Sequence, residues 1–111
     1  MQFDHIGLIT ETKKDGEDYV AATKVWVTNP RHHPFNVEWL RFEPDSPVIG
    51  PVRTEPHVSF RVENLAEAGK GLKVLMEPFD VGFATVAFYQ TNDGAVVELM
   101  EYKKGAEWQP V

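Results

Sequence analysis

The chain has 111 residues, contains no cysteine and carries a formal net charge of −6. This length fits one domain with a modest core, and the lack of cysteine excludes disulfides, thiolate metal sites and a cysteine nucleophile. The negative charge argues against a nucleic-acid partner, because phosphate binding requires clustered Lys and Arg. No segment approaches the roughly 18 apolar residues of a membrane span, and the first residues lack the pattern of a signal peptide. We therefore expect a cytoplasmic protein.

The first half of the sequence combines strand patterns with one weak helix pattern. Alternation or β-branched and aromatic content predicts three strands, at residues 3–9, 23–28 and 36–43. Residues 15–22 fit about two helical turns with Asp15 as the N-cap. Two prolines predict a loop over residues 29–34.

The second half has a clearer pattern, and it follows a connector over residues 44–56 that holds four prolines and one glycine. Strands are predicted at residues 57–62, 73–77, 84–91 and 95–102. Asn64, with Glu67 three residues later, predicts a capped short helix. Turns are expected at residues 78–83 and 92–94. Residues 103–111 form a tail.

Two stretches of the first half recur in the second. Residues 4–9 are similar to residues 56–61, and residues 37–42 are similar to residues 97–102. The second copy is longer by about eight residues, and repeats of this length usually mean structural units that share a core. We expect module one at about residues 1–45 and module two at residues 57–102.

Each copy brings one histidine and one glutamate, in the order His5, Glu38, His57 and Glu98. Equivalent residues of two copies can meet across a pseudo-two-fold axis. Two imidazoles and two carboxylates are suitable ligands for one divalent metal ion. The other interpretation is that the glutamates face solvent or pair with arginines.

The segments Phe3–Gly7, Pro56–Leu65 and Gly94–Glu101 resemble the first strand, the start of the second module and the closing strand of the vicinal oxygen chelate superfamily. That superfamily includes glyoxalase I, methylmalonyl-CoA epimerase, extradiol dioxygenases and bleomycin-binding proteins. The resemblance implies an α+β fold of two βαβββ-type modules, forming a curved mixed sheet around a cleft. The first module is expected to be shortened, and residues 1–111 to form a single domain.

The resemblance also implies which residues bind the metal. In metal-dependent members, each module supplies one ligand from its first strand and one from its last, which gives His5, Glu38, His57 and Glu98. Leu40 is an alternative to Glu38 for the ligand position of its strand. The internal repeat favours Glu38, since Val37-Glu38 matches Val97-Glu98.

Two functions follow as hypotheses. The first is a metal-dependent lyase or isomerase that removes a proton next to a carbonyl, with Zn, Ni, Co, Mn or Fe as cofactor and Glu98 or Glu38 as base. The alternative is a metal-free, non-catalytic binder of a small ligand, of the bleomycin-resistance type.

Further residues are candidates for substrate contacts and for assembly. Arg61 and Ser59 share a strand face with His57 and are candidate substrate contacts, although a surface ion pair is the simpler role for Arg61. Three aromatic residues exceed what a shortened first module can bury: Trp39, Phe42 and Trp108. They predict a homodimer.

Overall fold

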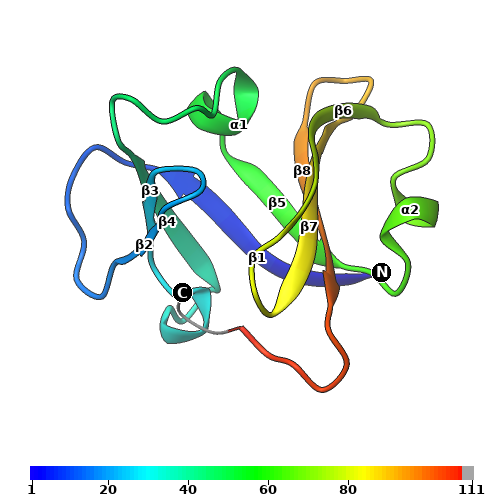
Figure 1. The fold of residues 1–111 in the computed structure, drawn as a ribbon, viewed down its shortest axis with the longest axis horizontal. Coiled ribbons are helices and arrows are strands. Elements are labelled where there is room, and N and C mark those ends of the chain that lie inside the picture. Colours follow the sequence, from blue (N-terminus) through cyan, green and yellow to red (C-terminus); the bar gives the residue numbers. More distant parts are fainter. Residues whose placement is uncertain (109–111) are drawn as a thin grey trace.

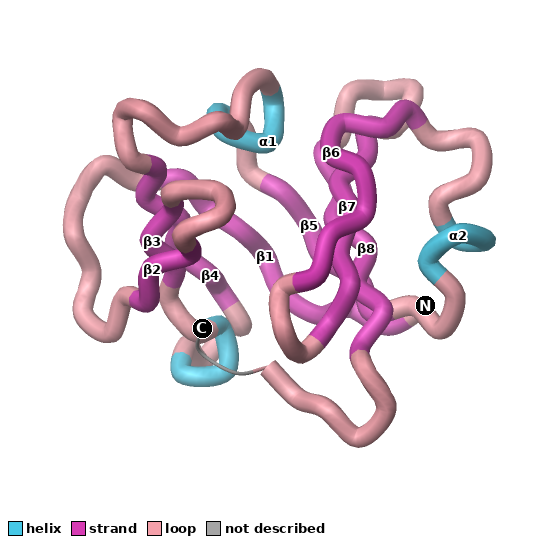
Figure 2. Tube along the Cα trace, viewed as in Figure 1, coloured by secondary structure: helices cyan, strands magenta, loops and turns pink. Residues whose placement is uncertain are grey.

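A computed structural model describes residues 1–108 of the chain, and their main element is one eight-stranded sheet. The strands are β1 (Gln2–Ile9), β2 (Asp18–Val20), β3 (Val25–Val27), β4 (Val37–Phe42), β5 (His57–Arg61), β6 (Lys73–Asp80), β7 (Ala84–Gln90) and β8 (Val96–Tyr102). Three single-turn helices lie outside the sheet (Figure 2): η1 (Pro30–His32), α1 (Pro51–Thr54) and α2 (Leu65–Ala68). No helix within residues 1–108 has the length and apolarity needed to cross a membrane.

The sheet is mixed and curls into a half-barrel, which confirms the predicted α+β fold with a curved mixed sheet. The strand order is β2-β3-β4-β1-β5-β8-β7-β6. β1 is parallel to β4, β5 is parallel to β8, and β1 and β5 are antiparallel at the centre. Figure 1 shows β2–β4 on one side and β6–β8 on the other, with β1 and β5 crossing between them.

The helix predicted for residues 15–22 is wrong, and this segment forms a turn followed by β2. Gly16 has φ 74°, which ends any helix, and the pattern has no apolar face to bury. β2 pairs with β3 as a hairpin, and the Tyr19 ring lies 4.8 Å from that of Trp26. Residues 18–20 thus add an edge strand where the sequence suggested a helix.

Prolines are compatible with regular structure at three places that the sequence analysis left as loop or turn. Pro30 begins η1 and Pro51 begins α1, because the first helical position has no amide partner to lose. β6 continues through Pro78 to Asp80, which an edge strand permits. The predicted helix after Asn64 is present, and the side chain of Asn64 accepts a hydrogen bond from the amide of Glu67.

One arginine bonds to much of the backbone of the connector over residues 44–56. The Arg53 guanidinium donates to the backbone carbonyls of Glu43, Pro44, Ser46 and Val48. These bonds replace the ladder that the irregular segment lacks. They fix Val48 and Val52, which pack on Phe88 of β7.

The strand register places the predicted site residues in two rows across the sheet centre. Gly7 of β1 pairs with Glu38 of β4 and with His57 of β5. Ser59 of β5 pairs with His5 of β1 and with Glu98 of β8. Each row therefore has a small residue in the middle, with a histidine on one side of it and a glutamate on the other.

Gly7 is required by close packing. A Cβ atom on this residue would lie 2.0 Å from Cε1 of His57. The imidazole thus lies flat against the backbone of β1, in the space that any larger residue would fill.

Gly7→Ala should lower the free energy of unfolding by about 1–3 kcal/mol through overpacking. The His57→Ala background supplies the control, because removal of the ring frees the space that the new methyl group needs. Chemical unfolding of both single variants and of the double variant measures the coupling. Equal effects of Gly7→Ala in the two backgrounds would show that the imidazole is not what excludes a side chain.

Candidate metal centre

Four side chains from four strands converge at the centre of the sheet. Nε2 of His5 lies 3.3 Å from Oε1 of Glu38 and 3.2 Å from Oε1 of Glu98. Nε2 of His57 lies 3.9 Å and 3.5 Å from the same two oxygens. The structure thus brings together His5, Glu38, His57 and Glu98, the four residues that the repeat singled out.

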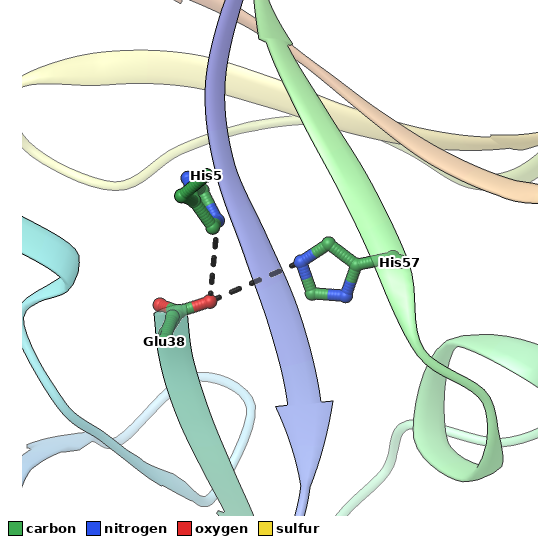
Figure 3. A group of neighbouring side chains, drawn as sticks. All are labelled: His5, Glu38 and His57. Atoms are coloured by element: carbon green, nitrogen blue, oxygen red, sulfur yellow. Dashed lines mark ion pairs between the residues drawn. The ribbon is translucent and has the colours of Figure 1, made fainter. Parts of the chain in front are cut away.

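Three of these four separations are close to those of ligands around a metal ion, and the fourth, from His57 to Glu38, is longer. Donor atoms placed tetrahedrally at 2.0–2.2 Å from one ion are about 3.3–3.6 Å apart. Ligand atoms of His5, Glu38 and His57 all lie within 4.8 Å of one another, and Figure 3 shows their side chains directed to a common point. This buried group can hold a metal ion.

The burial of the cluster supports that interpretation. The side chains of His5 and His57 are 0% and 1% exposed, and those of Glu38 and Glu98 are 7% and 9% exposed. Both ring nitrogens of His57 are buried without a hydrogen-bond partner. An unpaired buried donor or acceptor costs about 1–3 kcal/mol, and Nε2 of His57 faces the two carboxylates. A cation between them would satisfy this nitrogen, so the residues present fit a divalent metal.

The sequence analysis missed Asp4, which bonds to His5 on the side of the ring away from the glutamates. Oδ1 of Asp4 accepts a 2.6 Å hydrogen bond from Nδ1 of His5. Alternation along a strand puts neighbours on opposite faces, but the β1–β5 register shifts between Phe3 and His5, and both Asp4 and His5 are buried. A carboxylate on Nδ1 leaves Nε2 as the nitrogen that is free to face a metal ion, as in many metal sites.

Asp4 is itself held by residues that are distant in the sequence. Its Oδ2 accepts hydrogen bonds from Arg31 at 2.8 Å and from the Tyr102 hydroxyl at 2.7 Å. Burial raises the pKa of Asp4, but the hydrogen bonds from His5 and Tyr102 and the nearby charges outweigh it, and the net shift is downward. Asp4 is therefore a fixed anion behind His5.

Charge compensation in the cluster falls on His5. Burial lowers the pKa of this imidazole, yet the charge of Glu38 and the hydrogen bonds to Asp4, Glu38 and Glu98 raise it well above its usual value. Burial likewise raises the pKa of Glu98, and the neighbouring His5 and His57 reverse this and lower it strongly. Without a metal, His5 is an imidazolium between carboxylates.

An apolar cavity of about 100 Å³ lies over the cluster and reaches the two glutamates but neither histidine. Such a volume accommodates several water molecules or a small organic group. Trp108 covers the His5 ring with their centroids 5.0 Å apart, and Phe88 covers His57 at 5.1 Å. Both aromatic residues line the cavity. A ligand in the cavity therefore contacts the carboxylates directly, while the imidazoles stay shielded.

The remaining predicted site residues separate into two groups. The buried Ser59 hydroxyl donates to Oε1 of Glu98 and lies 3.0 Å from Nε2 of His5, so it belongs to the cluster. Arg61 does not reach the cavity: it stacks 3.6 Å over the Tyr102 ring and donates to Glu107. Leu40 lines the cavity wall, and Glu38 is the residue of that strand beside the histidines.

The aromatic residues that predicted a dimer are only partly exposed. Trp39, Phe42 and Trp108 are all half-buried, and Trp108 packs on Phe83 and His5. Part of each side chain stays exposed, and the homodimer stays a prediction. Residues 109–111 of the predicted tail lie outside the described residues.

Asp4→Asn should weaken divalent metal binding about 10–100-fold, which is the usual effect of removing a carboxylate that hydrogen-bonds to a metal-binding histidine. The amide has one acceptor oxygen, so it cannot satisfy both His5 and the Arg31–Tyr102 pair. Calorimetric titration of the metal-free protein measures the affinity, and Asp15→Asn in an exposed turn is the matched control. Unchanged affinity in the Asp4 variant would exclude this supporting role.

Comparisons with known proteins leave the family open. No family model matches the chain, and no curated protein matches it. One solved structure, the NAD-dependent benzaldehyde dehydrogenase from Legionella pneumophila, is 12% identical over 72% of this chain and 73% of that chain, with a TM-score of 0.41. A likeness of this extent carries no argument about function.

Proposed function

We propose that this protein is a metal-dependent lyase or isomerase of the vicinal oxygen chelate type. It would bind one divalent cation through His5, Glu38, His57 and Glu98, and remove a proton next to a carbonyl on a small oxygen-chelating substrate. The observation that carries the proposal is the convergence of these four side chains, with Nε2 of His57 unpartnered, below an apolar cavity.

The sheet supports a duplicated architecture. On each side of the β1–β5 pair, the first strand of a half is parallel to its last strand, and the other two strands follow outward. We infer two βαβββ-type modules of which the first has lost its helix, since residues 10–17 contain none. A pseudo-two-fold axis between β1 and β5 would exchange His5 with His57 and Glu38 with Glu98.

The chain's own residues divide the work as follows. The two histidines, held under Trp108 and Phe88, fix the position of the site and exclude water from it. A bound divalent cation supplies Lewis-acid stabilisation of the negative charge that develops on the substrate oxygens. One carboxylate takes the proton from the C–H bond and returns it to the same or the adjacent carbon.

Glu38 is the better placed base of the two glutamates. Ser59 donates to Glu98 and ties that carboxylate to the sheet, whereas no hydroxyl in the described chain donates to Glu38. Both glutamates line the cavity. Glu38 is therefore the freer of the two to turn toward a substrate, with Glu98 as the anchored ligand.

The alternative is a metal-free binder of a small apolar ligand, and the almost wholly apolar lining of the cavity favours it. In that case the imidazolium of His5 permanently offsets one of the two carboxylate charges. The metal content of protein purified without chelator separates the two: about one equivalent supports the enzyme, and none after reconstitution supports the binder. The expected homodimer and the cytoplasmic location stay predictions.

Saturating divalent metal should raise the melting temperature of the metal-free protein. A metal concentration 100 times the dissociation constant adds about 2.7 kcal/mol to the free energy of unfolding. Thermal melts with Zn, Ni, Co, Mn and Fe measure this, and His57→Ala should abolish the shift. Five unshifted melts would contradict the metal site.

Metal binding should also release a proton, and the affinity should fall as pH falls. The raised pKa of His5 means that the metal-free protein holds a proton at neutral pH, which the metal must displace. Calorimetry in buffers of different ionisation enthalpy counts the protons. Binding without proton release would show that His5 is not a ligand.

The metal-loaded protein should exchange solvent deuterium into hydroxyketones or hemithioacetals that carry two adjacent oxygens. Glu38→Gln should abolish exchange by removing the base while other ligands retain the metal, and His57→Ala should abolish it by loss of metal. Mass spectrometry measures the exchange, with Glu77→Gln on the exposed face of β6 as control. Full exchange by a metal-loaded Glu38→Gln protein would move the base to Glu98.

A further inference from the structure

The cavity above the cluster has no positively charged wall. Within residues 1–108, no lysine, arginine or histidine lines it, and its charged lining residues are Asp18, Glu38 and Glu98. Apart from Thr23 and Thr28, the other lining residues are apolar. The Thr28 hydroxyl accepts a hydrogen bond from the backbone amide of Trp39, so the polar groups of the lining include no charged donor.

The nearby arginines are engaged elsewhere. Arg41 forms a two-bond contact with Glu17, at 2.7 and 2.9 Å. Arg53 is directed to the carbonyls of the connector, and Arg61 stacks on Tyr102. None of these guanidinium groups is available to bind an anionic group in the cavity without breaking contacts that hold the fold.

The charge balance of the loaded site remains negative. One divalent cation neutralises Glu38 and Glu98, but it leaves Asp18, for which the described residues supply no ion-pair partner. Asp18 lies on β2, at one edge of the sheet, so it is next to the part of a ligand farthest from the central strands. In an apolar cavity, an uncompensated like charge weakens binding much more than in water.

We propose that the cavity selects small substrates whose body is apolar and either uncharged or cationic, and rejects those that carry a carboxylate, phosphate or phosphonate. The inference rests on the proposed function only for the chelating head group. Selection by tail charge follows from the lining itself and applies to the metal-free protein too. The proposal also means that Arg61 does not anchor an anionic substrate.

Three hydroxamates that share one chelating head and differ in tail charge test this selection on the metal-loaded protein. The probes are benzohydroxamate, its 4-carboxylate and its 4-trimethylammonium derivative. The neutral and cationic probes should bind at least about tenfold more tightly than the carboxylate, which corresponds to about 1.4 kcal/mol. Isothermal titration measures the dissociation constants. A carboxylate probe that binds as tightly as the neutral one would overturn the proposal.

A charge reversal at Asp18 should reverse the preference. Asp18→Lys should improve binding of the carboxylate probe and weaken that of the cationic probe, so that their affinity ratio shifts about tenfold or more. Glu77→Lys is the matched control, because it makes the same charge change on the opposite edge strand, at an exposed residue outside the cavity. Equal shifts in both variants would mean that only the overall charge acts, and would contradict the assignment to Asp18.

A metal-free arm distinguishes this proposal from the proposed function. Benzamide, benzoate and benzyltrimethylammonium carry no chelating group, and their binding to metal-free protein is measured by quenching of tryptophan fluorescence. Benzoate should bind most weakly. If no hydroxamate binds the loaded protein while this order holds, the enzyme proposal fails and the charge selection stands. Binding of benzoate equal to benzamide, or binding of none of the three, would overturn the selection.

Discussion

The structure depends on compensating two glutamates that are buried at the centre of an apolar sheet. Isolated buried carboxylates are too costly to persist, so Glu38 and Glu98 require a positive charge between them. Without a metal, His5 supplies it, and the carboxylates around its ring keep the proton in place. Neither nitrogen of His57 has a hydrogen-bond partner. A divalent cation bound as proposed would take the position of the proton on His5.

The site follows from the register of the four central strands, with no loop involved. Pairing of β1 with β5 sets each histidine opposite a small residue, and parallel pairing with β4 and β8 adds a glutamate to each row. The rows differ at the small residue: Gly7 lets the ring of His57 lie against the backbone, whereas Ser59 bonds to Glu98 and contacts His5. Asp4 hydrogen-bonds to His5, and His57 has no equivalent partner. The two halves therefore have equivalent ligands but unequal support, with His57 the less constrained imidazole.

Sequence patterns with a strong local cause predicted the structure well. The strands around His5, Glu38, His57 and Glu98 alternate clearly, and Asn64 caps α2 as its spacing predicts. Failures came where tertiary contacts decide. Residues 18–20 form an edge strand because β3 offers a partner, and the bulge that turns Asp4 inward leaves no sequence signal. Arg61 has the parity of His57 and Ser59, but the stack on Tyr102 draws its side chain out of the cavity. Strand parity predicts a face, and it does not predict where a long side chain ends.

The curvature of the sheet, which brings the four side chains of the cluster together, also determines what can approach them. Because the sheet curls, β2 at one edge and β6 at the other both line the cavity, and the segment after β8 returns to place Trp108 over His5. Apolar walls around two carboxylates raise the cost of leaving them uncompensated and strengthen every charge interaction inside. A ligand of the proposed site would therefore meet two conditions: its oxygens would have to satisfy a cation between Glu38 and Glu98, and its body would have to be compatible with a wall whose remaining charge, on Asp18, is negative.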